Sequence, residues 1–245
     1  MNAKEIVLSA AEELFGNKDV SAVDRWTSPD YIQHSAYASG GLDGVRQMLQ
    51  YLPPGFRYDL HRVIADGNHV ALHGTFHGFG PMPLIAFNVY RVEDGRLAEH
   101  WENLTPVVDE TVSGTSQTAG VAQVDDLHAT DDNRRLITHL MEAVLKGRPT
   151  GAVAEFFDTE HYIEHGPGSG TALGVFGGDE GVRRHDTLHK VIAEGNFVLT
   201  LSEGRSGATP TAYYDLFRVE DGKIVEHWDV VSEIKSDLPH SNGLF

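Results

Sequence analysis

The chain has 245 residues, no cysteine and a formal net charge of −17 at pH 7. The lack of cysteine excludes disulfides, thiolate nucleophiles and cysteine-ligated metals, and it suits a cytoplasmic protein. The negative charge repels phosphate backbones, so no nucleic-acid partner is expected. No apolar run approaches the roughly 20 residues that cross a bilayer, so no membrane partner is expected either.

The first half predicts helices followed by antiparallel strands. Ile6, Ala10 and Leu14 fall four residues apart, which is typical of an amphipathic helix. Short helices are expected over residues 20–26 and 44–51. Strand patterns follow, and the last two are joined by an Asp-Gly pair at 94–95, a strong hairpin signal.

The second half repeats this order. Residues 87–101 (FNVYRVEDGRLAEHW) match residues 214–228 (YDLFRVEDGKIVEHW) at eight of fifteen positions. The second copy opens with a helix predicted over residues 133–146, with Asp131 or Asp132 as N-cap. Helices before a sheet make an α+β fold. We therefore predict one domain over residues 1–112, a linker over 113–130 and a second domain over 131–245.

The two copies differ in one region. The glycine-rich stretch at 166–180 has no counterpart of equal length in the first copy, and the helix expected at 44–51 is cut short in the second. We expect the glycine-rich loop to lie over that gap. It lacks a Lys-Ser/Thr ending, which argues against a phosphate-binding loop.

A carboxylate beside imidazoles is the main chemical candidate. Strand alternation places His227 and Asp229 on one face of the last strand, and Asp215 lies on the strand before it. Such a carboxylate could remove a proton from a carbon next to a carbonyl, with a histidine stabilising the enolate oxygen. The alternative is structural: Asp215 pairs with an arginine and His227 is a satisfied core histidine.

The predicted site residues fall into two groups. The catalytic candidates are Asp215, His227 and His165. The expected pocket-lining residues are His189, Asp229, Tyr162, His34, His61, Asn88 and His100.

The first copy departs from this pattern. Asn88 stands where the second copy has Asp215. Asp229 corresponds to Asn103 or Glu102 depending on the register, and to Glu102 in the alignment without gaps. An amide cannot act as a base, so the first copy is predicted to be a scaffold or a site with another role. No metal is expected, because the histidine stripe at 69, 73 and 77 would span about 27 Å on a strand, which is too far for one ion.

Large apolar residues on both faces of the last strands indicate that each sheet packs on helices and on a second sheet. The two copies are therefore expected to form a pseudo-dimer within one chain, either as a monomer or within a homodimer.

Three motifs resemble a known family. Tyr-Ile-Gln-His at 31–34, His-Arg-Val-Ile-Ala-Asp-Gly-Asn at 61–68 and the Asp-Leu-Phe-Arg-Val-Glu-Asp-Gly hairpin from Asp215 resemble the SnoaL-like polyketide cyclase group of the nuclear transport factor 2-like superfamily. The resemblance implies two cone-shaped domains, each a curved antiparallel sheet wrapped on helices around an apolar pocket.

The resemblance also implies an activity. It points to a cofactor-independent acid–base enzyme, an aldol-type cyclase, isomerase or dehydratase, acting on a small apolar carbonyl compound. By position, Asp215 resembles the strand carboxylate, and His165 and His227 resemble polar pocket groups. The alternative is a non-catalytic domain pair that binds a small ligand or is structural. An Asp215 paired with arginine would favour that alternative.

Overall fold

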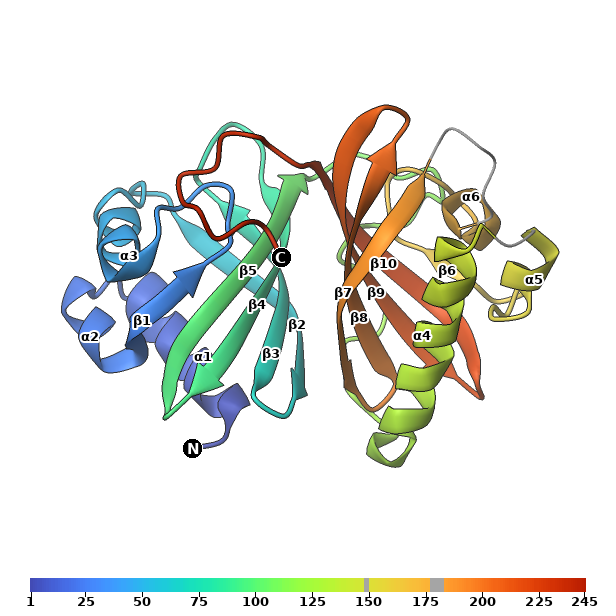
Figure 1. The fold of residues 1–245 in the computed structure, drawn as a ribbon, viewed down its shortest axis with the longest axis horizontal. Coiled ribbons are helices and arrows are strands. Elements are labelled where there is room, and N and C mark those ends of the chain that lie inside the picture. Colours follow the sequence, from blue (N-terminus) through green and yellow to red (C-terminus); the bar gives the residue numbers. More distant parts are fainter. Residues whose placement is uncertain (148–149, 177–182) are drawn as a thin grey trace. The chain divides into compact units, whose positions relative to one another are not determined.

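The computed structural model describes residues 1–147, 150–176 and 183–245 (Figure 1). The chain divides into two compact units. The first comprises Met1–Pro106 together with Lys235–Phe245, and the second comprises Val107–Ile234. This division differs from the predicted boundaries, because the predicted linker packs in the second unit and the last eleven residues pack in the first. The packing of one sheet on the other stays a prediction.

The first unit contains three α-helices and a five-stranded sheet of order β1-β5-β4-β3-β2. Strand β1 runs parallel to β5, and the other neighbours are antiparallel. The helices are α1 (Ala3–Ala11), which continues into a π-helical turn η1 (Glu12–Gly16), α2 (Val23–Trp26), preceded by a 3-10 turn (Val20–Ala22), and α3 (Gly41–Gln50). The strands are β1 (Thr27–Gln33), β2 (Arg57–Asp66), β3 (His69–His77), β4 (Leu84–Glu93) and β5 (Arg96–Pro106).

Helix α1 shows how sequence sets this packing. The Asn2 side chain accepts the Glu5 backbone N–H at 2.9 Å, and the Glu5 carboxylate accepts the Asn2 N–H, which completes a capping box. The apolar stripe then buries Ile6, Val7 and Ala10 in a core cluster shared with the sheet and α3. The predicted amphipathic helix is confirmed.

The second unit has the same topology, with the order β6-β10-β9-β8-β7 and one parallel pair, β6 with β10. The α+β fold and the duplication are therefore confirmed. The helices are a 3-10 turn (Leu127–Ala129), α4 (Thr130–Leu145), α5 (Thr150–Ala154) and α6 (Ala172–Phe176). The strands are β6 (Ile163–Glu164), β7 (Arg184–Glu194), β8 (Phe197–Ser206), β9 (Thr209–Glu220) and β10 (Lys223–Glu233).

Helix α4 begins earlier than predicted. Ala129 occupies the N-cap, so the predicted cap at Asp131 or Asp132 is wrong. Both aspartates lie in the first turn instead, where their negative charge interacts favourably with the positive end of the helix dipole.

The Asp-Gly hairpins form as predicted. Asp94 and Gly95 have φ of 49° and 76°, and Asp221 and Gly222 have 49° and 73°. Two successive left-handed residues make the turn whose twist matches that of the flanking strands. These turns fix the register of β4 with β5 and of β9 with β10, and so fix which side chains face each other across the strands.

Helix α3 has ten residues, and α6 forms within the glycine-rich stretch. The predicted shortening of the helix equivalent to residues 44–51 falls in part on residues 177–182, which lie outside the described residues, and stays a prediction. Within the part of the chain that the structure describes, no helix is long and apolar enough to traverse a bilayer.

Candidate functional site

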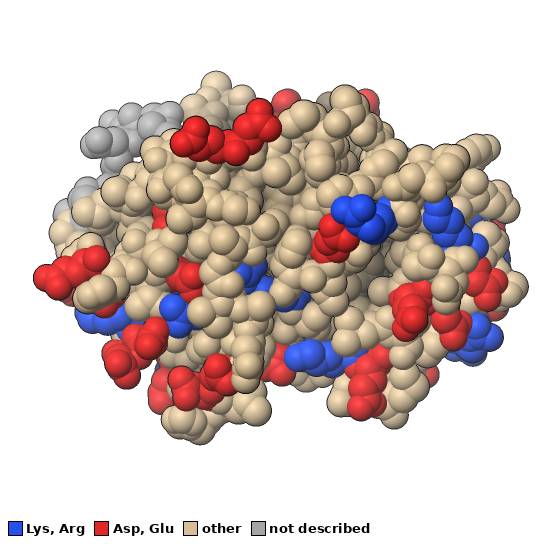
Figure 2. Space-filling model, turned by 180° about the vertical axis from the view of Figure 1, so that it is seen from behind, with Lys and Arg blue, Asp and Glu red and all other residues tan. Residues whose placement is uncertain are grey.

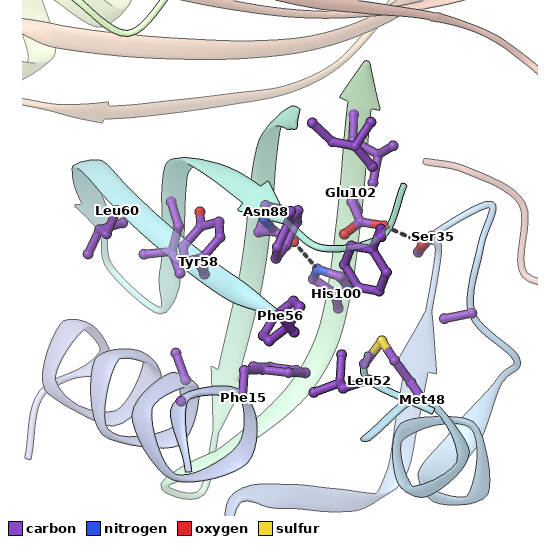
Figure 3. A pocket seen from close by; sticks show the side chains of 18 of the residues that line it. Phe15, Ser35, Met48, Leu52, Phe56, Tyr58, Leu60, Asn88, His100 and Glu102 are labelled. Carbon is purple, nitrogen blue, oxygen red and sulfur yellow. Dashed lines mark hydrogen bonds between the residues drawn. The ribbon is translucent and has the colours of Figure 1, made fainter. Parts of the chain in front are cut away.

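The first unit encloses a cavity of about 640 Å³ between α1, α3 and the inner face of its sheet. This volume lies within the roughly 300–1,000 Å³ typical of small-molecule pockets. Figure 3 shows that the wall is mostly aromatic and aliphatic, with a few polar side chains. The apolar wall includes Leu8, Phe15, Met48, Leu52, Phe56, Leu60, Leu72, Phe76 and Leu104, and the polar residues at issue are Ser35, Tyr58, Asn88, His100 and Glu102.

Glu102 is the ionisable group with the most distinctive environment in this cavity. It lies on β5 opposite Asn88 of β4, and its carboxylate accepts a hydrogen bond from Ser35 Oγ at 2.5 Å. No positively charged side chain pairs with it among the described residues. Burial raises the pKa of Glu102 to about 7, and the Ser35 hydroxyl offsets this only in part. A carboxyl group that is half ionised near neutral pH suits a general base.

His100 lies two residues before Glu102, on the same face of β5. Burial lowers the pKa of His100 to about 3, so the imidazole is neutral and carries one N–H. Its Nδ1 lies 2.9 Å from Gln33 Oε1, which also accepts the Ser35 backbone N–H, and its Nε2 lies 3.0 Å from the Asn88 amide. Nδ1–H therefore donates to Gln33 Oε1, and Nε2 faces Asn88 Oδ1.

Tyr58 places a phenol at the same cavity. Its hydroxyl is buried and faces Asn88 without closing a hydrogen bond of good geometry. Burial raises the pKa of Tyr58, so the phenol keeps its proton and can donate to a ligand. The ring fits because Gly74 on β3 has no side chain: a Cβ there would lie 2.3 Å from Tyr58 Cζ and Oη.

The Gly74 contact makes a testable prediction. Gly74→Ala should displace the Tyr58 ring and weaken binding of the neutral fluorophore N-phenyl-1-naphthylamine by about tenfold, the equivalent of about 1.4 kcal/mol. Fluorescence titration measures this affinity. Gly80→Ala is the matched control, because a Cβ there meets nothing within 4 Å. Equal affinity for the wild type and Gly74→Ala would contradict the assigned place of Tyr58.

In the second unit the equivalent positions carry charge. His227 Nδ1 lies 2.9 Å from Glu164 Oε1, and His227 Nε2 lies 3.1 Å from Asp215 Oδ1. Burial alone would lower the pKa of His227, but the flanking Glu164 and Asp215 outweigh it and raise the pKa to about 10. The second unit thus holds an imidazolium between two carboxylates, where the first holds a neutral imidazole between two amides.

Arg183 and Phe176 cover this charged group. Arg183 Nη1 lies 3.5 Å from Asp215 Oδ1, and the Arg183 guanidinium also pairs with Asp229. It lies over the Tyr213 ring at 4.9 Å, and the Phe176 ring is 5.1 Å from that of His227. The Asp215–His227 pair is therefore part of a buried ionic network.

The other predicted residues divide between these groups. His34 and His165 stack on Trp101 and Trp228, with ring centroids 5.0 and 4.6 Å apart, and do not join His100 or His227. Their other contacts are with Glu99, at 2.9 Å, and Glu226, at 3.3 Å.

The remaining candidates form local pairs. His61 lies 2.9 Å from Thr75 Oγ1, and His189 lies 3.4 Å from Glu203. Tyr162 donates to Glu164 and so joins the His227 network. The structure thus unites Asp215, His227, Asp229 and Tyr162, and in the first unit it places Asn88 and His100 at the cavity. It leaves the four histidines at 34, 61, 165 and 189 outside both groups. Their catalytic or binding roles stay predictions.

Sequence reasoning did not select Glu102, Gln33, Ser35 or Tyr58 as site residues. One signal was available in the repeat: the second copy has Glu164 at the position of Gln33 and Asp215 at the position of Asn88. Two amides replaced by two carboxylates around the same histidine mark a coupled set. Among the described residues, no cluster of three or more acidic or histidine side chains could hold a metal ion.

Parts of the chain are similar to known proteins. A family model described as SnoaL-like domain matches residues 9–100. A steroid delta-isomerase from Pseudomonas aeruginosa is 24% identical over 46% of this chain and 82% of its own, with a TM-score of 0.37. An LEH-like epoxide hydrolase from M. tuberculosis is 24% identical over 42% and 82%, with a TM-score of 0.36.

A third similar structure is wild-type IdmH from Streptomyces antibioticus, which is 19% identical over 42% of this chain and 92% of its own, with a TM-score of 0.36. No curated protein matches the chain. Residues 9–100 are thus similar to the SnoaL-like domain, and the second unit repeats the strand order of the first.

Proposed function

We propose that the first unit is a cofactor-independent acid–base enzyme acting on a small, largely apolar carbonyl compound. One observation carries this proposal: Glu102, with a pKa of about 7, faces an apolar cavity without a pairing cation among the described residues. A base of this pKa can remove a proton from a carbon next to a carbonyl group at neutral pH.

Each group has one role in the proposed step. The Glu102 carboxylate takes the proton, the C–H electron pair becomes the enolate double bond, and the carbonyl oxygen takes the negative charge. The Tyr58 phenol donates a hydrogen bond to that oxygen. Glu102, now protonated, either returns the proton to a different carbon, which is isomerisation, or gives it to a second carbonyl oxygen as the enolate carbon attacks, which closes a ring.

The charge distribution favours an uncharged ligand. Arg57 is the one basic residue among the described cavity residues, and it is engaged by Asp59 at 2.7 Å. On the face drawn in Figure 2, Lys and Arg side chains are scattered among Asp and Glu without a broad basic patch. With a net charge of −17, the protein would repel anions at long range.

This proposal moves the active site from the second unit to the first. Asp215 is paired with Arg183 and His227, which is the arrangement expected for the structural alternative. We therefore propose that the second unit contributes stability. The proposed base is Glu102 of the first unit, which is equivalent to Asp229 and lies on the strand next to the one that carries the equivalent of Asp215.

Hydrogen–deuterium exchange tests the proposal without knowledge of the natural product. Neutral cyclic ketones and enones are incubated with the protein in D₂O, and incorporation at the α-carbon is followed by NMR. The wild type should accelerate exchange of at least one compound that displaces N-phenyl-1-naphthylamine, and Asp215→Asn should retain this activity in its folded fraction. Displacement without accelerated exchange would favour the non-catalytic binding alternative.

A further inference from the structure

The C-terminal segment Lys235–Phe245 follows β10 of the second unit but packs in the first (Figure 1). His240 Nε2–H donates to the Ser35 carbonyl at 2.9 Å, and Asn242 Nδ2 donates to the Gln33 carbonyl at 3.0 Å. His34 Nδ1–H in turn donates to the Gly243 carbonyl at 2.9 Å. Three hydrogen bonds, from three residues of the segment, therefore hold it at the end of β1.

The residues that it holds are those that organise the cavity. The Gln33 side chain accepts from His100, and the Ser35 hydroxyl donates to Glu102. Tyr37 and Ala38, which come next in the chain, line the cavity. The C-terminal segment thus fixes the backbone at the same two residues whose side chains hold His100 and Glu102.

A similar set of hydrogen bonds holds the parallel strand of the second unit. Residues 113–116 follow β5 of the first unit but pack in the second. There Ser113 Oγ and Thr115 Oγ1 donate to the carbonyl of Glu164, the equivalent of Gln33, at 2.5 and 2.8 Å. His165 Nδ1–H donates to the Ser116 carbonyl at 3.0 Å, as His34 does to Gly243. Both units therefore use this type of contact at the end of their parallel strand.

We propose that Lys235–Phe245 is a positioning element of the first unit's site: it fixes Ser35 against Glu102 and Gln33 against His100, so the site depends on the end of the second repeat. The inference rests on the proposed function in taking Glu102 as the working group. Lys235 and His240 add packing contacts, since Lys235 Nζ lies 4.8 Å from the Tyr37 ring centre and a Cβ on Gly40 would lie 3.5 Å from His240 Cβ.

The test uses the full chain with His240→Ala and Asn242→Ala combined. Loss of both donors frees the Ser35 and Gln33 backbone, so the variant should bind N-phenyl-1-naphthylamine about tenfold more weakly. The titration midpoint of the Glu102 carboxyl, followed by its infrared band with Glu102→Gln as the reference, should move by at least about half a pH unit.

Two controls make the result specific. Ser113→Ala with Thr115→Ala breaks the equivalent contacts of the second unit and should leave the probe affinity and the Glu102 midpoint unchanged. His240→Gln keeps a donor near the Nε2 position and should restore most of the affinity lost in His240→Ala, which also separates positioning from loss of folding. Wild-type probe binding and Glu102 titration in the double variant would overturn the inference. Neither readout needs turnover, so a failure of the proposed activity is distinguishable.

Discussion

Replacing Glu102 with glutamine is expected to lower kcat for proton abstraction by about 10²–10⁴-fold while changing KM little, because the amide keeps the shape of the side chain but cannot accept the proton. The wild-type rate should rise with pH and reach half its maximum near pH 7, where the carboxyl group ionises. The variant should show no such rise. Exchange of α-deuterium across pH 5–9 measures both effects, and a wild-type pH profile in Glu102→Gln would exclude Glu102 as the base.

The same residue should have an opposite effect on stability. The pKa of Glu102 is raised from 4.5 to about 7 in the folded state, so its stabilising contribution is complete below pH 4.5 and is lost as pH rises through about 7. Glu102→Gln should therefore be more stable than the wild type at pH 8, by on the order of 2 kcal/mol after allowance for partial exposure, with the difference vanishing near pH 4. Urea unfolding measures this, and the exposed Glu93→Gln is the control.

The second large effect is expected from the charged group around His227. Asp215→Asn alone should lower the free energy of unfolding by about 3–5 kcal/mol, because it removes one partner of a buried ion pair. Combining it with Glu164→Gln recreates the amide–imidazole–amide set of the first unit. The double variant should then lose less stability than the two single losses added together, since His227 can become neutral.

The pKa of His227 provides the direct readout. Its NMR titration should fall from about 10 to below 6.5 in the double variant. In the wild type the raised pKa means that the stabilisation is complete below pH 6.5 and is lost as pH rises through about 10. Glu203→Gln, which affects a partly exposed contact with His189, is the matched control. Additive losses in the double variant, or an unchanged His227 titration, would contradict the assigned network.

Local and repeated features could be predicted from the sequence because they depend on neighbouring residues. The Asp-Gly pairs predicted both hairpins, and the repeated apolar spacing predicted the first helix of each unit. The position of the cavity could not be predicted in this way. It depends on whether Arg183 and Phe176 cover the polar strand residues, as in the second unit, or whether Gly74 leaves room for Tyr58, as in the first.

A similar reason explains why the sequence pointed to Asp215, and not to Glu102, as the base. Alignment of the copies shows which carboxyl groups are equivalent, but the pKa of each depends on cations and burial that only the folded chain brings together. Arg183 pairs with Asp215 and Asp229, whereas within the described part of the chain Glu102 has the Ser35 hydroxyl as its hydrogen-bond partner. The C-terminal contacts were missed because they are made to backbone carbonyls, which leave no pattern in side-chain types.

The placement of residues 107–126 and 235–245 separates two boundaries that coincide in most duplicated proteins. The segment that was copied, read as one stretch of chain, is not the segment that folds as one body. A cut after Pro106 would release a first half without the peptide that holds its β1 end, and a second half carrying a tail with nothing to bind. Each unit therefore contains a segment that follows the strands of the other unit in the chain.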